Sequence, residues 1–398
     1  MNVHLRTRLR MAVLGGILTT LSALVAAPGA GAATVTPSAC ATSGTSAPAP
    51  RVVGGTLDTR FTDAWRQFGN SGGGWADRRG WGASDGMYST DLPGHRVVWM
   101  LNDTFMGPVN DDESMPLDNA FVHNSAVFGG RDGLPDTTVT AGTHEHPQSL
   151  AGETNTAPPW DPSGTNAHWY WNGDGIVDGG RLRIFEFAQA PTDGDPPFNF
   201  TWTGTDIATF SKDVKLESIA PTYAASNVQW GVELMRCGGY VYVYGAESGH
   251  MHVARARTGH LVDHDWDFFT GSGWSKDPTA SARLVDGGVG SSYSVSRVGD
   301  HYVLTTSVGL GGTIYAATAD SPTGPFTNRT AVYRAPEEGP GIYAGYNVAA
   351  HPELSRPGEL LISYNVNTWS IYDIYANANN NRPRFVDVHF ADDAASAR

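Results

Sequence analysis

Polar and apolar positions alternate along most of the chain, and one pattern occurs five times. A segment that mixes polar and aromatic residues is followed by a tight turn and then by a strongly apolar segment. Alternation with a period of two, bounded by Gly or Asp turns, is typical of a β-hairpin. The five expected pairs of strands are Trp81–Ser89 with Val97–Leu101, His168–Asn172 with Leu182–Phe187, Val228–Met235 with Tyr240–Tyr244, Tyr293–Val298 with Tyr302–Thr306, and Tyr346–Ala350 with Leu360–Tyr364.

Three shorter strands are expected after the last three hairpins, at Met251–Arg257, Thr313–Ala319 and Ile371–Ala376. The hairpins recur at similar intervals, and the chain shows almost no helical periodicity. Repeats of about four strands at such an interval are typical of a β-propeller, so the pattern predicts an all-β, five-bladed β-propeller. A β-sandwich with long insertions is the alternative, but it does not explain five similar hairpins.

The first 32 residues have the pattern of a secretory signal peptide rather than of a folded segment. Arg6, Arg8 and Arg10 precede an apolar run, and Ala30-Gly31-Ala32 is a small-residue cleavage site. A membrane anchor would need about 20 apolar residues and no such cleavage site. We therefore expect residues 1–32 to be the signal, 33–60 an Ala/Ser/Thr/Pro-rich linker, 61–390 the propeller and 391–398 a short tail.

Composition narrows the partners of the secreted protein. The 398 residues include 26 Lys+Arg and 40 Asp+Glu, which gives a formal net charge of −14. An acidic chain is poorly suited to nucleic acid or to an anionic membrane surface. With 17% charged residues, 48 Gly and 12 Trp, the composition is typical of an extracellular all-β protein, which we expect to be a monomer.

Cys40 and Cys237 are the two cysteines, and both lie in the part that would be exported. An oxidising compartment favours a disulfide between them. Two unpaired thiols are the alternative.

Two aspartates of the first expected hairpin are the leading catalytic candidates. Asp85 lies in the first inner strand, and Asp103 ends the apolar run of the next strand. Antiparallel pairing places them in neighbouring positions at one end of the hairpin. Two carboxyl groups that face a groove are sufficient for glycoside hydrolysis, one as acid and one as base or nucleophile. Alternatively, Asp85 closes a turn before Gly86 and Asp103 caps a loop.

Other polar and aromatic residues fall on strands that would line the central channel. Glu233 lies in an otherwise apolar strand, so it must be hydrogen-bonded, paired or functional. A satisfied polar contact between blades is the alternative for Glu233. Trp81, Trp171 and Trp230 could stack on sugar faces, although packing between blades is the commoner role of a buried Trp. For His351 the alternative is a structural role in the tight segment before Pro352. The remaining candidates for binding substrate are Trp81, His123, Asn124, Trp230, Tyr293, Tyr346, Asn347 and His351.

Several other catalytic motifs are absent from the sequence. It contains no H-E-x-x-H zinc motif and no G-x-S-x-G serine-hydrolase motif, and two cysteines cannot form a Cys-rich zinc site. No Walker loop or dinucleotide fingerprint follows an expected strand.

Several segments resemble a known group of enzymes. Ala83–Gly86, Leu92–Trp99 and Asn102–Thr104 resemble the opening blade of the actinobacterial endo-D-arabinanase family, as do His123–Ser125 and His351–Asn365. Ala317–Phe326 resembles the strand and turn found across five-bladed furanosidase propellers. The segment Gly133–Thr165, rich in Pro, Thr and Gly, has no clear counterpart in that family.

The resemblance implies hydrolysis of arabinofuranosidic linkages in arabinan by two first-blade aspartates, which correspond to Asp85 and Asp103. On this basis we expect Asp85 to be the general base and Asp103 the general acid, although the order could be reversed. The wider superfamily has a catalytic Glu in the third blade, and Glu233 is the nearest match. In that layout Glu233 would be the acid and Asp103 a supporting group.

The expected substrate is a polysaccharide or oligosaccharide, and the expected chemistry needs no cofactor. Some such propellers hold a channel Ca²⁺, but no clustered acidic loop in this sequence argues for one. The competing hypothesis is a carbohydrate-binding propeller that has lost its catalytic activity.

Overall fold

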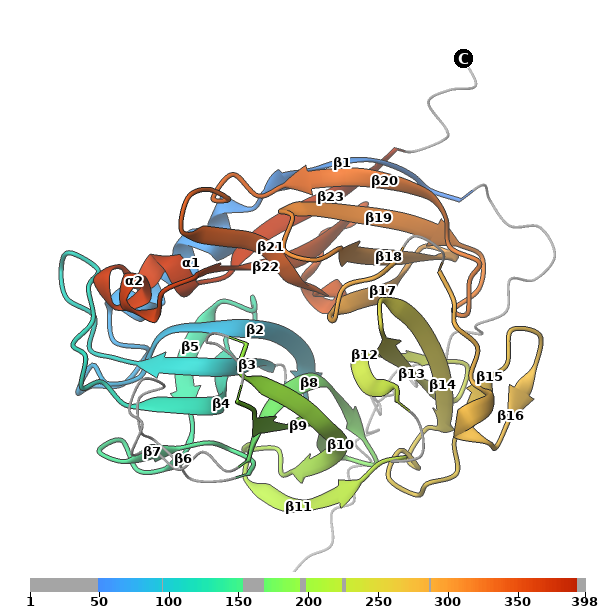
Figure 1. Cartoon of the computed structure of the whole chain (residues 1–398), viewed down its shortest axis with the longest axis horizontal. Coiled ribbons are helices and arrows are strands. Elements are labelled where there is room, and N and C mark those ends of the chain that lie inside the picture. The colour runs from blue at the N-terminus through green and yellow to red at the C-terminus, as the bar shows by residue number, and fades with distance from the viewer. Residues whose placement is uncertain are drawn as a thin grey trace, which may run out of the picture. The chain divides into compact units, whose positions relative to one another are not determined.

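The five repeated hairpins form the inner strands of five antiparallel sheets (Figure 1). The computed structural model describes residues 49–94, 96–152, 168–193, 198–223, 227–285 and 288–391. The innermost strands of neighbouring sheets contact one another in a closed ring, from β2 (Trp81–Leu92) through β8 (Trp169–Asp178), β12 (Gln229–Cys237) and β17 (Tyr293–Val298) to β21 (Ile342–Ala350) and back to β2. The all-β, five-bladed β-propeller is confirmed.

Each blade continues outward from its innermost strand. Blade 1 adds β3 (Arg96–Met106), β4 (Phe121–Gly129) and β5 (Pro135–Val139), and a small sheet of β6 (Ala141–Gly142) and β7 (Pro147–Gln148) follows it. Blade 2 adds β9 (Arg181–Pro191), β10 (Phe200–Phe210) and β11 (Leu216–Pro221). Blade 3 adds β13 (Tyr240–Glu247), β14 (His250–Arg257), β15 (Asp267–Phe269) and β16 (Trp274–Ser275). Blade 4 adds β18 (His301–Ser307), β19 (Thr313–Ala319) and β20 (Thr327–Arg334).

Blade 5 joins the two ends of the described chain. It adds β22 (Glu359–Thr368) and β23 (Arg384–Ala391) to β21, and its outermost strand is β1 (Arg51–Leu57). β1 pairs with β23 in antiparallel fashion, and Val52 is buried against the blade. The expected linker at residues 33–60 is therefore wrong from Arg51 onward, because backbone pairing and an apolar contact hold that segment in the sheet.

Helix α1 (Thr59–Asn70) was not expected from the sequence. Asp58 caps its first turn by accepting from the backbone N–H of Phe61 at 2.8 Å. Phe61, Trp65 and Phe68 have helical spacing, and they pack over the junction of blades 1 and 5. The apolar stripe of this helix is short, and the surrounding strand pattern obscures it.

The expected strand Ile371–Ala376 is wrong, because this segment is helix α2. Ile374 and Tyr375 are buried against Phe105 and Phe121 of blade 1, a contact that suits spacing of three and four residues rather than two. The third strand of blade 5 is β23 instead. Short 3₁₀-helices occur at Pro278–Ala280, Pro352–Leu354 and Ala378–Asn381.

The expected signal peptide, Cys40 and residues 392–398 of the expected tail lie outside the described residues. Cys237 is buried, and its pairing with Cys40 stays a prediction. Within the part of the chain that the structure describes, no helix is long and apolar enough to cross a membrane.

Candidate active site

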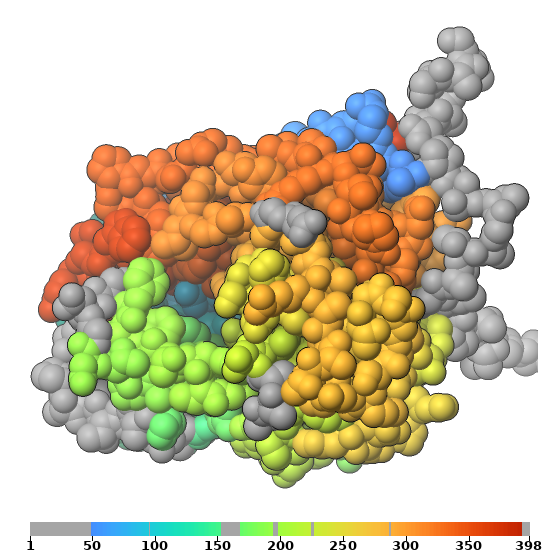
Figure 2. All heavy atoms as spheres, turned by 45° about the vertical axis from the view of Figure 1, so that its right-hand side comes forward, coloured from blue at the N-terminus to red at the C-terminus, as the bar shows by residue number. Residues whose placement is uncertain are grey.

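A cavity of about 830 Å³ opens at one end of the ring of inner strands. Figure 2 shows the corresponding hollow, with blue atoms of the N-terminal part of the chain at its base, between green and orange atoms of later blades. Asp85 and Asp103 both line this cavity. The two leading candidates from the sequence therefore share one site.

Irregular pairing of β2 turns Asp85 toward the cavity. The register between β2 and β3 is interrupted on both sides of Asp85, which lies opposite Asn102. Because of this, Asp85 and Tyr88 both line the cavity although they are an odd number of residues apart. Gly86 permits the irregularity: it has φ 62°, and a Cβ there would lie 2.7 Å from the side-chain nitrogen of Asn102.

On β3, a residue with a strained backbone likewise turns its side chain toward the cavity. Asn102 and Asp103 are consecutive, yet both line the cavity. Asp103 has φ 29°, a left-handed conformation, and it is skipped in the pairing of β3 with β4, where Asn102 faces Asn124 and Thr104 faces Val122. Strain of this kind is concentrated at functional sites.

Asp85 lies in a poorly solvated environment. Burial, together with the nearby charge of Asp103, raises the pKa of Asp85 to about 7. The hydroxyl of Tyr346 donates to Asp85 Oδ2 at 3.1 Å and partly offsets this rise. Asn367 in turn donates to the Tyr346 oxygen at 3.0 Å, which orients that hydroxyl. Near neutral pH, Asp85 is thus able to hold or release a proton.

Asp103 is held by two ring nitrogens. The indole N–H of Trp171 donates to Asp103 Oδ1 at 2.8 Å, and His123 Nδ1 lies 2.8 Å from the same oxygen. In the tautomer with a proton on Nδ1, His123 also donates. Two N–H groups on one oxygen suit a negatively charged carboxylate and leave its other oxygen for a reacting group.

His123 acts on Asp103 rather than on the cavity. It is buried, stacks on Trp169 with ring centroids 4.9 Å apart, and does not line the cavity. The structure places His123, expected to bind substrate, behind Asp103, where it is arranged to position that carboxylate.

Glu233 lies beneath the site. It is buried on β12, is absent from the cavity lining and is bonded to Ser294. Burial raises its pKa well above the usual range, and the charges of Asp174 and Glu353 add to the rise. Glu233 therefore lies outside the cavity lining that Asp85 and Asp103 share, and its role as the catalytic acid stays a prediction.

Five other predicted binding residues are also buried away from the cavity. Their side chains serve blade packing: Tyr293 donates to a backbone carbonyl of blade 3, and His351 is bonded to Ser89 and Ser363. Tryptophans packed between elements have no face left for a sugar. The expected binding residues that lie outside the cavity lining are Trp81, Asn124, Trp230, Tyr293 and His351. Tyr346 and Asn347 do line the cavity.

The remaining wall of the cavity is aromatic and amide-rich. Asp85 and Asp103 are the two acids of the lining, and none of its described residues is Lys, Arg or His. Aromatic faces and amides are the groups that bind the apolar faces and hydroxyls of a neutral sugar. The lining includes Trp171, Phe200, Tyr343 and Trp369, and the amides Asn172, Gln189, Gln229 and Asn367.

Comparison with known proteins identifies the family. Residues 75–390 match the model of a family described as "Domain of unknown function (DUF5005)", which is most of the chain. The chain belongs to the DUF5005 family. No curated protein matches its sequence.

Solved structures resemble the DUF5005 domain in fold. A candidate hydrolase from Bacteroides ovatus ATCC 8483 is 23% identical with a TM-score of 0.64, and the match covers 83% of this chain and 89% of that one. A GH43_1 enzyme from Xanthomonas citri, solved with xylotriose, is 13% identical with a TM-score of 0.45 and coverage of 79% and 89%. A candidate exo-β-1,3-galactanase from Bifidobacterium bifidum s17 has 11% identity, a TM-score of 0.47 and coverage of 78% and 89%. At 23% identity the first likeness shows the propeller fold alone, and the narrower resemblance to endo-D-arabinanases stays a prediction.

The residues that sequence reasoning missed belong to other blades. Asn172 of blade 2 and Asn102 of blade 1 exchange two hydrogen bonds, at 2.6 and 3.0 Å, across the blade junction. Trp171, Tyr343 and Trp369 also line the cavity. Of these, Trp171 lies on an expected inner strand and was a candidate for stacking on a sugar, whereas Trp369 lies beyond β22 and has no local signal.

A channel Ca²⁺ stays a prediction for the DUF5005 domain. Among the described residues no group of three or more His, Cys, Asp or Glu is arranged to hold a metal ion. Asp174 instead accepts the backbone N–H groups of Gly175 and Leu234 at 2.7 Å each.

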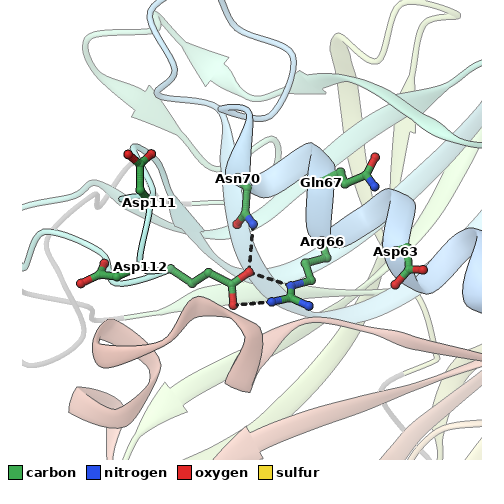
Figure 3. A pocket seen from close by; sticks show the side chains of 7 residues that line it. Asp63, Arg66, Gln67, Asn70, Asp111 and Asp112 are labelled. Carbon is green, nitrogen blue, oxygen red and sulfur yellow. Dashed lines mark hydrogen bonds and ion pairs between the residues drawn. The ribbon is translucent and has the colours of Figure 1, made fainter.

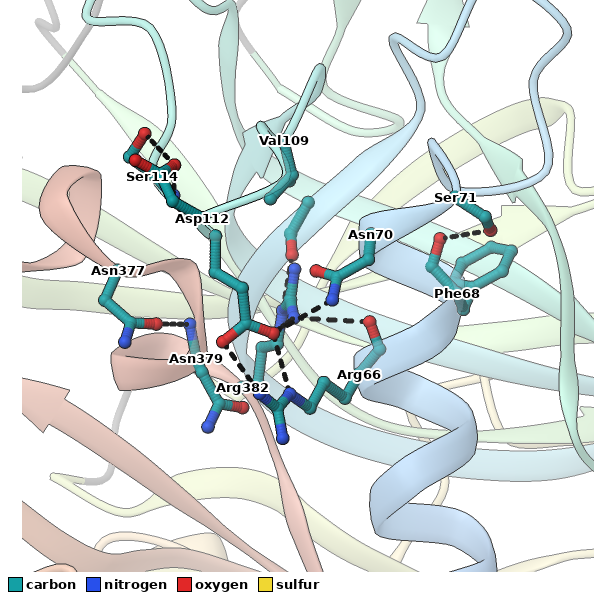
Figure 4. Close-up of polar contacts among 12 residues, drawn as sticks. Arg66, Phe68, Asn70, Ser71, Val109, Asp112, Ser114, Asn377, Asn379 and Arg382 are labelled. Carbon is teal, nitrogen blue, oxygen red and sulfur yellow. Dashed lines mark hydrogen bonds and ion pairs between the residues drawn. The ribbon is translucent and has the colours of Figure 1, made fainter.

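A second pocket, of about 500 Å³, lies beside α1 and shares no lining residue with the cavity (Figure 3). Its Arg66 is bonded to both carboxyl oxygens of Glu113 at 2.7 and 3.0 Å. Arg382 lies buried beneath and donates to the backbone oxygens of Gly82 and Arg66 (Figure 4). These contacts anchor α1 to the propeller, and we assign this pocket no catalytic role.

Proposed function

We propose that this DUF5005 domain is a secreted glycoside hydrolase that cleaves arabinofuranosidic linkages in a polysaccharide, D-arabinan being one candidate. The observation that carries the proposal is the pair of carboxyl groups, Asp85 and Asp103, in one cavity with different surroundings. Two carboxyl groups with separate roles are the equipment for glycoside hydrolysis.

The surroundings favour the reverse of the roles expected from the sequence. Asp85, with a pKa of about 7, is the general acid that protonates the leaving oxygen. Asp103, held by Trp171 and His123, is the carboxylate that activates water or attacks the anomeric carbon. Tyr346 orients Asp85, and no cofactor is needed for either step.

The lining supports a neutral saccharide as substrate. An anionic sugar would meet two acids and no compensating base among the described residues of the cavity. Aromatic side chains supply stacking faces, and amides supply hydrogen bonds to hydroxyls. Arabinofuranose is proposed from the resemblance of Ala83–Gly86 and Asn102–Thr104, and secretion from the pattern of residues 1–32.

The test is hydrolysis of D-arabinan, L-arabinan and xylan, measured as reducing ends released. We expect release from an arabinan, and we expect Asp85→Asn and Asp103→Asn each to lower the rate by about 10²–10⁴-fold. Asp91→Asn is the matched control, because Asp91 is an exposed aspartate on the same strand as Asp85 and should leave the rate unchanged.

Each alternative result has a defined meaning. If Asp85→Asn and Asp103→Asn both kept the wild-type rate, the two carboxyl groups would not be the catalytic pair. Hydrolysis of xylan but of neither arabinan would show that the substrate is not an arabinan. Binding of an arabinan without release of reducing ends would favour the carbohydrate-binding propeller.

A further inference from the structure

Two series of aromatic contacts lead away from the carboxyl pair. From Asp103 the series runs through Trp171 to Phe200, whose ring centroid lies 4.6 Å from that of Trp171, and on to Phe198 at 6.4 Å. This series belongs to blade 2 and to the connection between β9 and β10. It forms one wall of the cavity.

The other series begins at Asp85. Tyr346 donates to Asp85, its ring lies 5.3 Å from that of Tyr343, and Tyr343 lies 4.8 Å from Trp369. Tyr343 and Tyr346 belong to β21 of blade 5, and Trp369 is the residue that follows β22. They form the facing wall.

The two walls meet at Phe198 and Trp369. Their ring centroids are 6.0 Å apart with the planes at 82°, an edge-to-face contact between blade 2 and blade 5. Both side chains line the cavity, and both are half exposed, at 52% and 51%. In Figure 2, green atoms of blade 2 rise beside the hollow toward the red and orange atoms of blade 5.

The contacts therefore close into a ring that begins at one carboxyl group and ends at the other. A groove that is open along its length accepts a polymer laid across it from the side. A ring of touching side chains does not accept an internal segment of a polymer. Such a segment continues in both directions, and the Phe198–Trp369 contact would block one of them. A free chain end meets no such obstacle.

We infer that the Phe198–Trp369 contact makes this site specific for chain ends, so that short saccharides are released from a terminus of the polysaccharide. The inference rests on the proposed glycoside hydrolase function and adds the mode of attack. Phe198 and Trp369 are specificity-determining residues that do not take part in proton transfer.

The experiment compares two readouts during hydrolysis of a soluble arabinan, the viscosity of the solution and the number of reducing ends. Attack at chain ends produces many reducing ends with little loss of viscosity, whereas internal cleavage lowers the viscosity early. We expect the first behaviour from the wild-type protein. Trp369→Ala should shift the ratio several-fold toward loss of viscosity, because it opens the ring.

Two further variants make the result specific. Phe198→Ala breaks the same contact from the opposite blade and should produce the same shift, even if the Trp369 variant folds poorly. Tyr372→Ala removes an aromatic side chain that is 57% exposed and lies outside the cavity lining, so it should keep the wild-type ratio.

Early loss of viscosity with the wild-type protein would overturn the inference and leave the proposed function standing. An unchanged ratio in both ring variants would also overturn it. Absence of reducing ends from every polysaccharide would overturn the proposed function, and this inference with it.

Discussion

At the scale of single residues, the difference between Asp85 and Asp103 comes from their neighbours. Asp85 is half-buried and poorly solvated beside another acid, so its neutral form is favoured and its pKa rises to about 7. Asp103 accepts from Trp171 and faces His123. One carboxyl group is thus suited to give a proton and the other to carry charge.

The hydrogen bond that Tyr346 donates to Asp85 affects the upper pH limit of the proposed activity. Tyr346 stabilises the ionised form of Asp85, so Tyr346→Phe raises the pKa of Asp85 further above its usual range. Because protonated Asp85 is the active form, we expect the alkaline limb of kcat/KM against pH to move to higher pH. Tyr343→Phe, which keeps the Tyr346 bond, should leave that limb in place. An acidic limb that moves to higher pH, with the alkaline limb unchanged, would instead assign Asp85 the role of base.

At the scale of strands, interrupted pairing determines which side chains reach the cavity. The innermost strands of blades 1, 2, 3 and 5 each contain a break in register near the cavity, whereas β17 of blade 4 pairs regularly. In blade 3 the break contains Gly231, at φ 92°, where a Cβ would lie 2.1 Å from the ring of Phe185. These irregularities redirect side chains that strict alternation would place on the opposite face.

Strand β1 provides a test at the same scale, because its two faces differ sharply. Val52 is 8% exposed and packs in blade 5, whereas the adjacent Val53 is 49% exposed. Val52→Asp should lower the free energy of unfolding by about 3 kcal/mol, since it buries a charge. Val53→Asp should change it by less than about 0.5 kcal/mol. Thermal or denaturant unfolding measures both, and equal effects would show that β1 does not hold the blade as described.

At the scale of the whole molecule, three blades bring buried acids close to one another. Asp174, Glu233 and Glu353 come from blades 2, 3 and 5, and burial raises the pKa of each, to about 7 for Asp174 and about 8 for Glu353. Glu353 accepts from Ser89 of blade 1, so the group also links the first and last blades. The cluster is stable while its members are protonated.

Stability should therefore fall as the pH rises. The unfolded chain releases the Glu353 proton near pH 4.5, and the folded chain does so near pH 8, so the folded form binds more protons between these values. Each such group lowers the free energy of unfolding by about 1.4 kcal/mol per pH unit over its window. Glu353→Gln should flatten the decline measured by denaturant unfolding between pH 5 and 8. Asp118→Asn, at an exposed position, should keep the wild-type slope, and a Glu353→Gln slope equal to it would contradict the prediction.

Much of the fold follows from local sequence. Alternation along strands such as Val97–Leu101 and Tyr240–Tyr244, with Gly at the turns, determines hairpins because both partners are close in the chain. The location of Asp85 and Asp103 in one site follows from the same cause, since they lie on the two strands of one hairpin. The segment of helix α2 has the pattern of a strand because six residues are too few to distinguish the strand period of 2 from the helix period of 3.6.

The rest of the site depends on contacts between blades, which no local pattern encodes. Glu233 and Asp85 both lie on innermost strands, yet packing buries Glu233 under the cavity and leaves Asp85 facing it. Trp369 meets Phe198 only because blades 2 and 5 both flank blade 1 in the closed ring and both contribute to the cavity lining. The sequence by itself determined the repeated hairpins and the acid pair, because alternation and turns act over a few residues. Only the tertiary structure decided which side chains reach the cavity and which meet across it, because that depends on how distant blades pack.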